Sequence, residues 1–151
     1  MNKIKLIAEI GWNHMGDMSL AKKMIEQASI SGADICKFQT WNEGSLKSGE
    51  WDNDGRRDVY KKAQLSEDDH YYLKQVCNEN KIEFLTSIFN INDLDFLKKL
   101  NSKMIKVPSH EIYNKELIKK CLNNFNLTLI STGASKKSEI DDLKKEFNLE
   151  K

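Results

Sequence analysis

The segment Ala33-Asp34-Ile35-Cys36-Lys37-Phe38 is a short, mostly apolar run that lies between Gly32 and Gln39. Its apolar residues are nearly continuous rather than alternating, a pattern typical of a parallel strand covered on both faces. Four other runs share this character and span residues 4–9, 82–86, 104–107 and 127–131. We therefore expect five buried parallel strands along the chain.

Segments with the period of an α-helix separate these runs. Apolar residues recur every three or four positions in them, at Leu20, Met24, Ile25 and Ala28, at Leu73, Val76 and Cys77, at Leu94, Leu97 and Leu100, at Leu117, Ile118, Cys121 and Leu122, and at Ile140, Leu143 and Phe147. Residues that favour helix starts precede four segments: Asp17 with Ser19, Ser66 with Asp69, Asn92, and Asn114. Five strand–helix units predict a parallel α/β sheet. An open doubly wound sheet and the first five units of a (β/α)8 barrel both fit, although a whole barrel usually needs about 250 residues.

The composition is that of one soluble globular domain. Of the 151 residues, 39% are hydrophobic and 31% are charged, and the net charge is +1. We therefore expect neither a nucleic acid nor a membrane as a partner. The first residues lack the apolar core of a signal peptide, so a cytoplasmic location is expected. Cys36, Cys77 and Cys121 match no disulfide or zinc pattern and are expected to be buried.

The connection after the second run, residues 40–65, is much longer than the others. It contains three glycines and the only two arginines, Arg56 and Arg57. A long loop inside a compact domain is often a functional lid, and a solvated surface insertion is the alternative interpretation.

Polar side chains end or follow every predicted strand. They are Glu9, Asn13 and His14 for the first strand, Lys37 and Gln39 for the second, Thr86 and Ser87 for the third, Lys106, Ser109 and Glu111 for the fourth, and Ser131 and Thr132 for the fifth. The carboxyl ends of parallel strands lie on one side of a sheet, where ligands bind. Lysines and hydroxyls there suit a small anion with a phosphate or carboxylate group. Carboxylates beside them suit proton transfer or the binding of a cation.

Lys37 and Lys106 are the most informative of these residues, because each interrupts an apolar strand. A buried ammonium group must be paired with an opposite charge or bind an anion. Pro108 predicts an extended turn after the fourth strand, which would direct Ser109 and Glu111 towards the same side.

Other polar motifs are less specific. No glycine-rich phosphate loop is present, but Ser131-Thr132-Gly133 precedes a predicted helix whose N-terminus would suit a phosphate. The spacing of His14 and His110 does not indicate a metal site, and His70 lies at a predicted helix start.

At these residues the sequence resembles the sialic acid synthase family. Six motifs carry the resemblance in order: Ala8-Glu9-Ile10-Gly11-Trp12-Asn13-His14 with Gly16-Asp17, Gly32-Ala33-Asp34, Lys37-Phe38-Gln39-Thr40, Phe84-Leu85-Thr86-Ser87, Lys106-Val107-Pro108-Ser109-His110-Glu111, and Ser131-Thr132-Gly133. Each motif is modest alone, and their order and spacing make the resemblance specific. The family includes synthases for N-acetylneuraminate, its 9-phosphate, legionaminate and pseudaminate.

The resemblance implies an aldolase-type barrel that condenses phosphoenolpyruvate with an N-acetylmannosamine-like sugar and releases phosphate. The residues implied to bind phosphoenolpyruvate are Lys37, Ser87, Lys106, Ser109 and Ser131. Gln39 and Glu111 are implied to contact the sugar, Glu111 also to transfer a proton, and Glu9 to lie near a divalent metal and its water. That metal, Mn or Mg, would act as a Lewis acid. Its histidine ligands come from later family sequence, so none is expected in this chain.

The resemblance also implies which part of the enzyme this is. Residues 1–151 correspond to the N-terminal part of the barrel, about its first five units, without the C-terminal barrel half and the antifreeze-like domain of the family's homodimer. Two motifs depart from the family: Thr86-Ser87-Ile88-Phe89-Asn90 replaces Ser-Thr-Pro-Phe-Asp, and His110 replaces a common glycine. The second change places an imidazole beside Glu111.

Three alternatives remain open from the sequence. In the first, the chain is a non-catalytic anion-binding α/β module. In the second, it is a half-barrel that assembles with another chain, including a second copy of itself. In the third, Lys106 is a Schiff-base lysine of the kind that some aldolase barrels place at a strand end.

Overall fold

A computed structural model describes residues 4–45, 48–133 and 135–149. Five parallel strands form one sheet whose order follows the chain, β1-β2-β3-β4-β5. The strands are β1 (Ile7–Gly11), β2 (Ile35–Thr40), β3 (Glu83–Ile88), β4 (Met104–Val107) and β5 (Leu127–Ile130). The helices are α1 (Met18–Ile30), α2 (Arg56–Ala63), α3 (Glu67–Glu79), α4 (Leu94–Lys99), α5 (Lys115–Asn124) and α6 (Lys137–Phe147).

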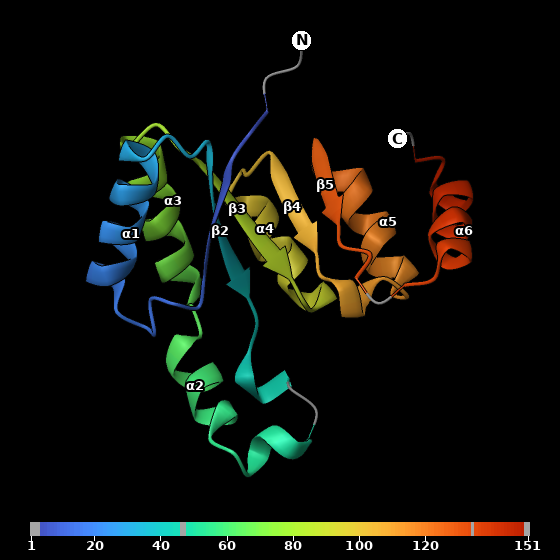
Figure 1. Cartoon of the computed structure of the whole chain (residues 1–151), viewed down its shortest axis with the longest axis horizontal. Helices are drawn as coiled ribbons and strands as arrows, with labels where there is room; N and C mark the ends of the chain where they lie inside the picture. The colour runs from blue at the N-terminus through green and yellow to red at the C-terminus, as the bar shows by residue number, and fades with distance from the viewer. Residues whose placement is uncertain (1–3, 46–47, 134, 150–151) are drawn as a thin grey trace.

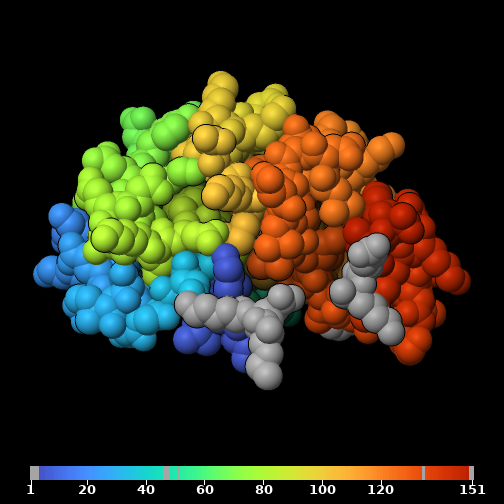
Figure 2. All heavy atoms as spheres, turned by 90° about the horizontal axis from the view of Figure 1, so that it is seen from above, coloured from blue at the N-terminus to red at the C-terminus, as the bar shows by residue number. Residues whose placement is uncertain are grey.

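The strand order distinguishes between the two predicted architectures. A doubly wound sheet reverses its order at a switch point, whereas a barrel adds each strand next to the previous one. In the space-filling view from above, the colours follow one another in sequence order along an arc, from the blue segment of α1 to the red segment of α6 (Figure 2). The prediction of a partial (β/α)8 barrel is therefore confirmed.

The core lies mainly between the sheet and its helices. Alternate residues of β2 separate its two faces: Cys36 and Phe38 belong to the large cluster with the helices, whereas Ile35 packs with Leu85 and Met104 on the inner face. Both faces are covered over much of the sheet, which explains the nearly continuous apolar runs. All three cysteines are buried and free, as expected.

Helix starts follow the predicted capping pattern at three of four sites. Oδ1 of Asp17 accepts hydrogen bonds from the backbone N–H groups of Ser19 and Leu20, at 2.8 and 3.0 Å. Ser66 forms a capping box with Asp69, and Asn114 caps α5. Asn92 was also expected to cap a helix, and this prediction is wrong. The residue that caps is Asn90, whose side chain accepts a hydrogen bond from the backbone N–H of Asn92. Asn90 begins the 3-10 turn Ile91–Asp93, which precedes α4.

Strand lengths are set by the neighbouring strand. β1 spans residues 7–11 rather than the predicted 4–9, because its partner β2 begins opposite Ile7 and residues 4–6 have no strand to pair with. β2 and β3 extend past their predicted ends because they pair as far as Thr40 and Ile88.

The long connection is largely helical, which corrects its prediction as a loop. It contains α2 and two 3-10 turns, Glu43–Ser45 and Glu50–Asp52. Arg57 ties the turns together through ion pairs with Glu43, at 2.6 Å, and Asp52. This segment projects beyond the carboxyl ends of the strands (Figure 1). Of the helices that the structure describes, none is both long and apolar enough to cross a membrane.

Candidate active site

The register of the sheet places five predicted site residues on its inner face. Glu9 pairs with Lys37, and Gln39 pairs with Ser87, which pairs in turn with Lys106. Paired residues of parallel strands share a face, as do residues two apart on one strand. All five therefore lie together near the carboxyl ends of β1 to β4, as the sequence predicted.

Lys37 is paired with a carboxylate. Its Nζ donates a hydrogen bond to Oε1 of Glu9 at 2.8 Å, and its side chain is 4% exposed whereas that of Glu9 is 55% exposed. A bulge follows Glu9 in β1, where Gly11 adopts a φ of +56°. A Cβ atom at Gly11 would lie 3.3 Å from Oε1 of Glu9, so glycine leaves this carboxylate its space.

Lys106 is the second cation of the inner face, and it is partly buried. Burial lowers the pKa of Lys106, the positive charge of Lys37 lowers it further, and the negative charge of Glu9 opposes both effects. Ser87, which is fully buried, lies beside Lys106 in the register. The ammonium groups of Lys37 and Lys106 are close enough to repel one another, and the strand between theirs carries the hydroxyl of Ser87. This arrangement suits an anion with two negative charges.

Glu111 is oriented by the start of α5. Pro108 is extended, with φ −73° and ψ 161°, and a 3-10 turn follows it (Ser109–Glu111). Oε2 of Glu111 accepts a hydrogen bond from Nδ2 of Asn114 at 2.8 Å, while Oδ1 of Asn114 caps the helix. Asn114 thus positions the carboxylate, a role that the sequence did not reveal beyond a helix cap.

The loop after β5 lies beside the turn after β4. A Cβ atom at Gly133 would lie 3.5 Å from Cβ of Ser109, an ordinary contact distance. The backbone N–H of Ser131 donates to the carbonyl of Val107 at 3.0 Å, which holds Ser131 next to β4. The structure therefore brings Ser109 and Ser131 near each other at the carboxyl end of the sheet.

Two strand-end residues lie elsewhere. His14 is 1% exposed, its ring packs on Phe38 on the helix side, and burial lowers its pKa. Its Nδ1 accepts a hydrogen bond from the Gly16 N–H at 3.1 Å. Thr86 also faces the helices, because its neighbour Ser87 occupies the inner face.

Thr86 belongs to a buried hydrogen-bond chain behind the sheet. Nδ1 of His70 lies 2.7 Å from the carbonyl of Ser66, which only accepts, so Nδ1 carries the proton. Nε2 of the neutral ring then accepts from the hydroxyl of Thr40 at 2.7 Å. Thr40 accepts in turn from Thr86 at 2.8 Å. His70 is thus buried and structural, and burial lowers its pKa.

The described residues do not supply a metal site of their own. Glu9 and Glu111 bring carboxylates to the carboxyl end of the sheet, but within the described residues no three histidine, cysteine or carboxylate side chains form a metal-binding group. The unpartnered Nε2 of His14 lies buried on the opposite face of the sheet.

A cavity of about 620 Å³ lies next to the predicted sugar contacts. Its lining comes from β2 and from the segments after β1, β2, β3 and β4: Trp12, Gln39, Trp41, Tyr60, Phe89, Pro108 and His110. We call it the aromatic cavity. The sequence analysis did not predict it, and its only signal was the cluster of aromatic residues just after predicted strands.

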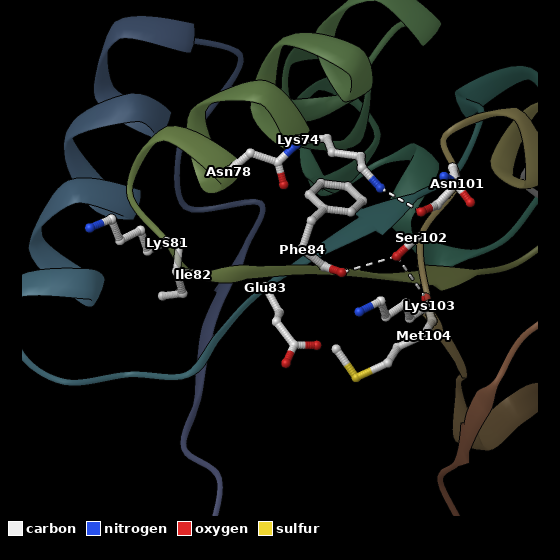
Figure 3. A pocket seen from close by; sticks show the side chains of 10 residues that line it. All are labelled: Lys74, Asn78, Lys81, Ile82, Glu83, Phe84, Asn101, Ser102, Lys103 and Met104. Atoms are coloured by element: carbon white, nitrogen blue, oxygen red, sulfur yellow. Dashed lines mark hydrogen bonds between the residues drawn. The ribbon is translucent and has the colours of Figure 1, made fainter.

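A second cavity, of about 450 Å³, opens at the amino-terminal ends of β3 and β4 (Figure 3). Nζ of Lys74 points across it and donates to the carbonyl of Asn101 at 2.8 Å, and the hydroxyl of Ser102 donates to the carbonyl of Phe84 at 3.1 Å. Active sites of barrels lie at the opposite end of the strands. We assign this cavity no part in the site.

Known proteins are similar in sequence to most of the chain. The chain is 36% identical to an N,N'-diacetyllegionaminic acid synthase of Legionella pneumophila over 89% of its length, and 30% identical to a pseudaminic acid synthase of Helicobacter pylori over 91%. It covers 41% and 44% of those two proteins, so it spans less than half of their length.

Solved structures agree with the fold. An N-acetylneuraminic acid synthetase from Leptospira borgpetersenii matches with a TM-score of 0.88 at 29% identity, over 97% of this chain and 50% of that one. A truncated 3-deoxy-D-arabino-heptulosonate 7-phosphate synthase from Thermotoga maritima matches with a TM-score of 0.70 at 14% identity, which shows a common fold alone. The model of the NeuB family matches residues 24–148, which is most of the chain. This match, together with the strand order of the sheet and the lysines of its inner face, shows that the chain belongs to the NeuB family.

Proposed function

We propose that this chain forms the phosphoenolpyruvate-binding half of a nonulosonic acid synthase. The complete enzyme joins C3 of phosphoenolpyruvate to the aldehyde carbon of an N-acetylmannosamine-like sugar, adds water at C2, and releases phosphate from C2. The observation that carries the proposal is the pair of inner-face lysines, Lys37 and Lys106, with the buried Ser87 in register with Lys106.

In this proposal the anion site holds the phosphate and carboxylate groups of phosphoenolpyruvate. Lys37 and Lys106 supply the positive charge, and Ser87, Ser109 and Ser131 supply hydroxyl groups. The positive charges of Lys37 and Lys106 repel one another in the free protein, and this repulsion supports the assignment. A bound anion would relieve it.

The sugar would lie next to the anion site, on the side of Gln39 that borders the aromatic cavity. Gln39 lies in register with Ser87 and also lines the aromatic cavity, so it borders both regions. Glu111, which Asn114 holds in place, would contact the sugar and transfer a proton at the carbonyl oxygen of the sugar aldehyde. Glu9, which is half exposed, would lie beside the water that attacks C2.

Other parts of the proposal concern the complete enzyme. Residues 1–151 would form the N-terminal part of its barrel, and a C-terminal barrel half and an antifreeze-like domain would complete it. A divalent metal, Mn or Mg, would be held by ligands outside this chain, because the described residues do not fit one. The complete enzyme is expected to act as a cytoplasmic homodimer.

One observation favours the alternative of a half-barrel that assembles with another chain. Within the part of the chain that the structure describes, β1 and β5 are each paired on one side only, and on them Ile7 and Leu127 are 43% and 48% exposed. Unpaired strand edges with apolar side chains favour association with a further polypeptide. That polypeptide would supply the remaining barrel units.

The decisive experiment measures phosphate release from phosphoenolpyruvate with Mn and N-acetylmannosamine. The purified chain is assayed with and without a polypeptide that supplies the remaining barrel half. Turnover only in the mixture supports the proposal, and turnover by the chain alone would show that copies of it complete the site. Binding of phosphoenolpyruvate without turnover in either case would leave an anion-binding module, and loss of binding as well would refute the proposal.

A further inference from the structure

His110 is the one histidine of the chain that water can reach. Its side chain is 59% exposed, whereas His14 and His70, the other two histidines of the sequence, are buried. It lies in the 3-10 turn Ser109–Glu111, at the carboxyl end of the sheet. An exposed imidazole exchanges protons with water near neutral pH, so His110 has a chemical capacity that the two buried rings lack.

The turn brings the imidazole of His110 close to one oxygen of Glu111. Nε2 of His110 lies 3.8 Å from Oε1 of Glu111. The other oxygen, Oε2, accepts the hydrogen bond from Nδ2 of Asn114 at 2.8 Å. The imidazole also packs on the ring of Phe89, with a centroid distance of 5.3 Å. Asn114 and Phe89 thus hold the two groups side by side, with Oε1 as the oxygen nearest the imidazole.

The separation of the two groups suits action on two neighbouring atoms. A distance of 3.8 Å is too long for a direct hydrogen bond between them. One group that accepts a proton and one that donates a proton are what general acid–base catalysis requires. The two oxygens bonded to C1 of a closed sugar ring, the hydroxyl oxygen and the ring oxygen, are neighbours of this kind.

The proposed reaction needs its sugar in the open form. An amino sugar of this class is in water mainly a closed hemiacetal, in which C1 carries a hydroxyl group and no carbonyl. A site that bound only the open form would lose apparent affinity in proportion to the small open fraction. A site that binds the closed ring and opens it avoids that loss.

We propose that His110 and Glu111 form an acid–base pair that opens the ring of the acceptor sugar. This inference rests on the proposed function, since it assumes a sugar bound at Glu111. The Glu111 carboxylate takes the proton of the C1 hydroxyl group, C1 and that oxygen form the carbonyl bond, and the bond from C1 to the ring oxygen breaks. The ring oxygen takes a proton from Nε2 of the protonated imidazole. Glu111 is then protonated and His110 neutral, so the step is balanced.

Ring opening also prepares Glu111 for the condensation. Its new proton lies at the oxygen that becomes negative when C3 of phosphoenolpyruvate attacks the aldehyde carbon, and it returns to that oxygen. His110 recovers its proton from water, which reaches its exposed side chain. The same pair therefore produces the aldehyde and supplies the proton that the aldehyde needs.

The test measures ring opening on the 151-residue chain. A ring that opens and closes again interconverts its two anomers, and polarimetry of a freshly dissolved single anomer of N-acetylmannosamine records the rate. The chain, saturated with phosphoenolpyruvate, is compared with free imidazole at the same concentration. We expect the chain to be faster by roughly 100-fold or more, a gain typical of positioned acid–base groups. Glucose should be accelerated no more by the chain than by free imidazole.

Variants assign the acceleration to the pair. His110→Gly and Glu111→Gln should each reduce it by about tenfold or more, while calorimetry shows that His110→Gly still binds phosphoenolpyruvate as the wild type does. Added imidazole should restore part of the rate to His110→Gly and none to Glu111→Gln, a rescue that a merely structural role of His110 would not produce. Tyr113→Ala is the matched control and should keep the full rate. Tyr113 is close to Glu111 in sequence, but it is 65% exposed and its hydroxyl bonds to Glu139.

The outcomes separate the ring-opening pair from the proposed function. The pair is refuted, and the anion site stands, if phosphoenolpyruvate binds but the chain is no faster than free imidazole, both alone and mixed with a polypeptide that supplies the remaining barrel half. Equal rates for the wild type and His110→Gly would refute it as well, because Glu111 would then act without His110. Loss of phosphoenolpyruvate binding by the wild-type chain would refute the proposed function, and this inference with it.

Discussion

Nζ of Lys37 and Oε1 of Glu9 are joined across two neighbouring strands by a 2.8 Å hydrogen bond, with the lysine buried and the carboxylate half exposed. The two partners therefore do not contribute equally to the stability of the folded chain. Removal of Glu9 leaves a buried ammonium group without its countercharge, whereas removal of Lys37 leaves a carboxylate that water can reach.

Substitutions at this pair should show the asymmetry. We expect Glu9→Ala to lower the free energy of unfolding by about 1–2 kcal/mol, because the ammonium of Lys37 stays buried. Lys37→Met should change it by less than about 1 kcal/mol, because an apolar chain of similar length fills the space. Lys37→Met should nevertheless abolish phosphoenolpyruvate binding. Urea unfolding and calorimetric titration measure the two effects, and equal destabilisation by both variants would contradict this account.

The pKa of Lys106 predicts how anion binding depends on pH. Burial and the charge of Lys37 lower this pKa in the free protein, and a bound anion should raise it again. We therefore expect proton uptake on phosphoenolpyruvate binding at alkaline pH, and an affinity that falls as pH rises through the lowered pKa. Calorimetry in two buffers of different ionisation enthalpy detects the uptake.

Substitution of Lys106 provides the control. Lys106→Met should weaken phosphoenolpyruvate binding roughly tenfold to hundredfold and remove the proton uptake, whereas Lys106→Arg should retain part of the affinity. Borohydride with a carbonyl substrate should leave Lys106 unmodified. A trapped adduct would instead support the Schiff-base alternative.

Two buried histidines predict acid sensitivity. Burial lowers the pKa values of His14 and His70 below the value of about 6.5 expected in the unfolded chain. Between these values the unfolded chain binds more protons, so stability is complete above about pH 6.5 and falls as pH decreases below it. We expect a loss of up to about 1.4 kcal/mol per pH unit for each histidine.

Urea unfolding at several pH values between 7.5 and 5 measures this slope. His70→Gln should be less stable at pH 7.5, because Thr40 and Ser66 lose their ring partner, and should show a smaller slope. An unchanged slope would mean that His70 is not protonated on unfolding.

Gly16 and Gly32 allow backbone strain to be separated from steric overlap. Both have a positive φ, +79° and +86°. A Cβ atom at Gly16 would lie 2.2 Å from the carbonyl oxygen of Lys62, at the end of α2, whereas one at Gly32 meets nothing within 4 Å. We expect Gly32→Ala to cost about 1 kcal/mol and Gly16→Ala clearly more, because α2 must move. Chemical denaturation of both variants measures the difference, and equal losses would exclude the overlap.

The sequence predicted those features that depend on local pattern. The strand at Met104–Val107 was predicted with its bounds, and the buried, charge-paired Lys37 followed from a lysine inside an apolar run. The residue pattern alone did not say which of two adjacent residues, Thr86 or Ser87, faces the inner side, whereas the family resemblance implied Ser87. That choice depends on the register with β2 and β4, which neighbouring strands determine.

Features built from distant segments were not predictable in the same way. α2 has few apolar residues, and Arg57 ties the segment together through Glu43 and Asp52, fourteen and five positions away. The aromatic cavity takes its lining from five separate stretches of the sequence, so no single motif indicates it. Such sites appear only when the folded strands bring their loops together.

The strand order also bears on how the chain is made. Because each strand pairs with the one that precedes it in sequence, a nascent polypeptide can extend the arc unit by unit as it leaves the ribosome, without waiting for a distant partner. The two halves of the anion site are then synthesised apart, Lys37 with the second unit and Lys106 with the fourth. Glu9 and Lys37 are thus both synthesised before Lys106, so that the buried ion pair can form before the repelling second cation is present.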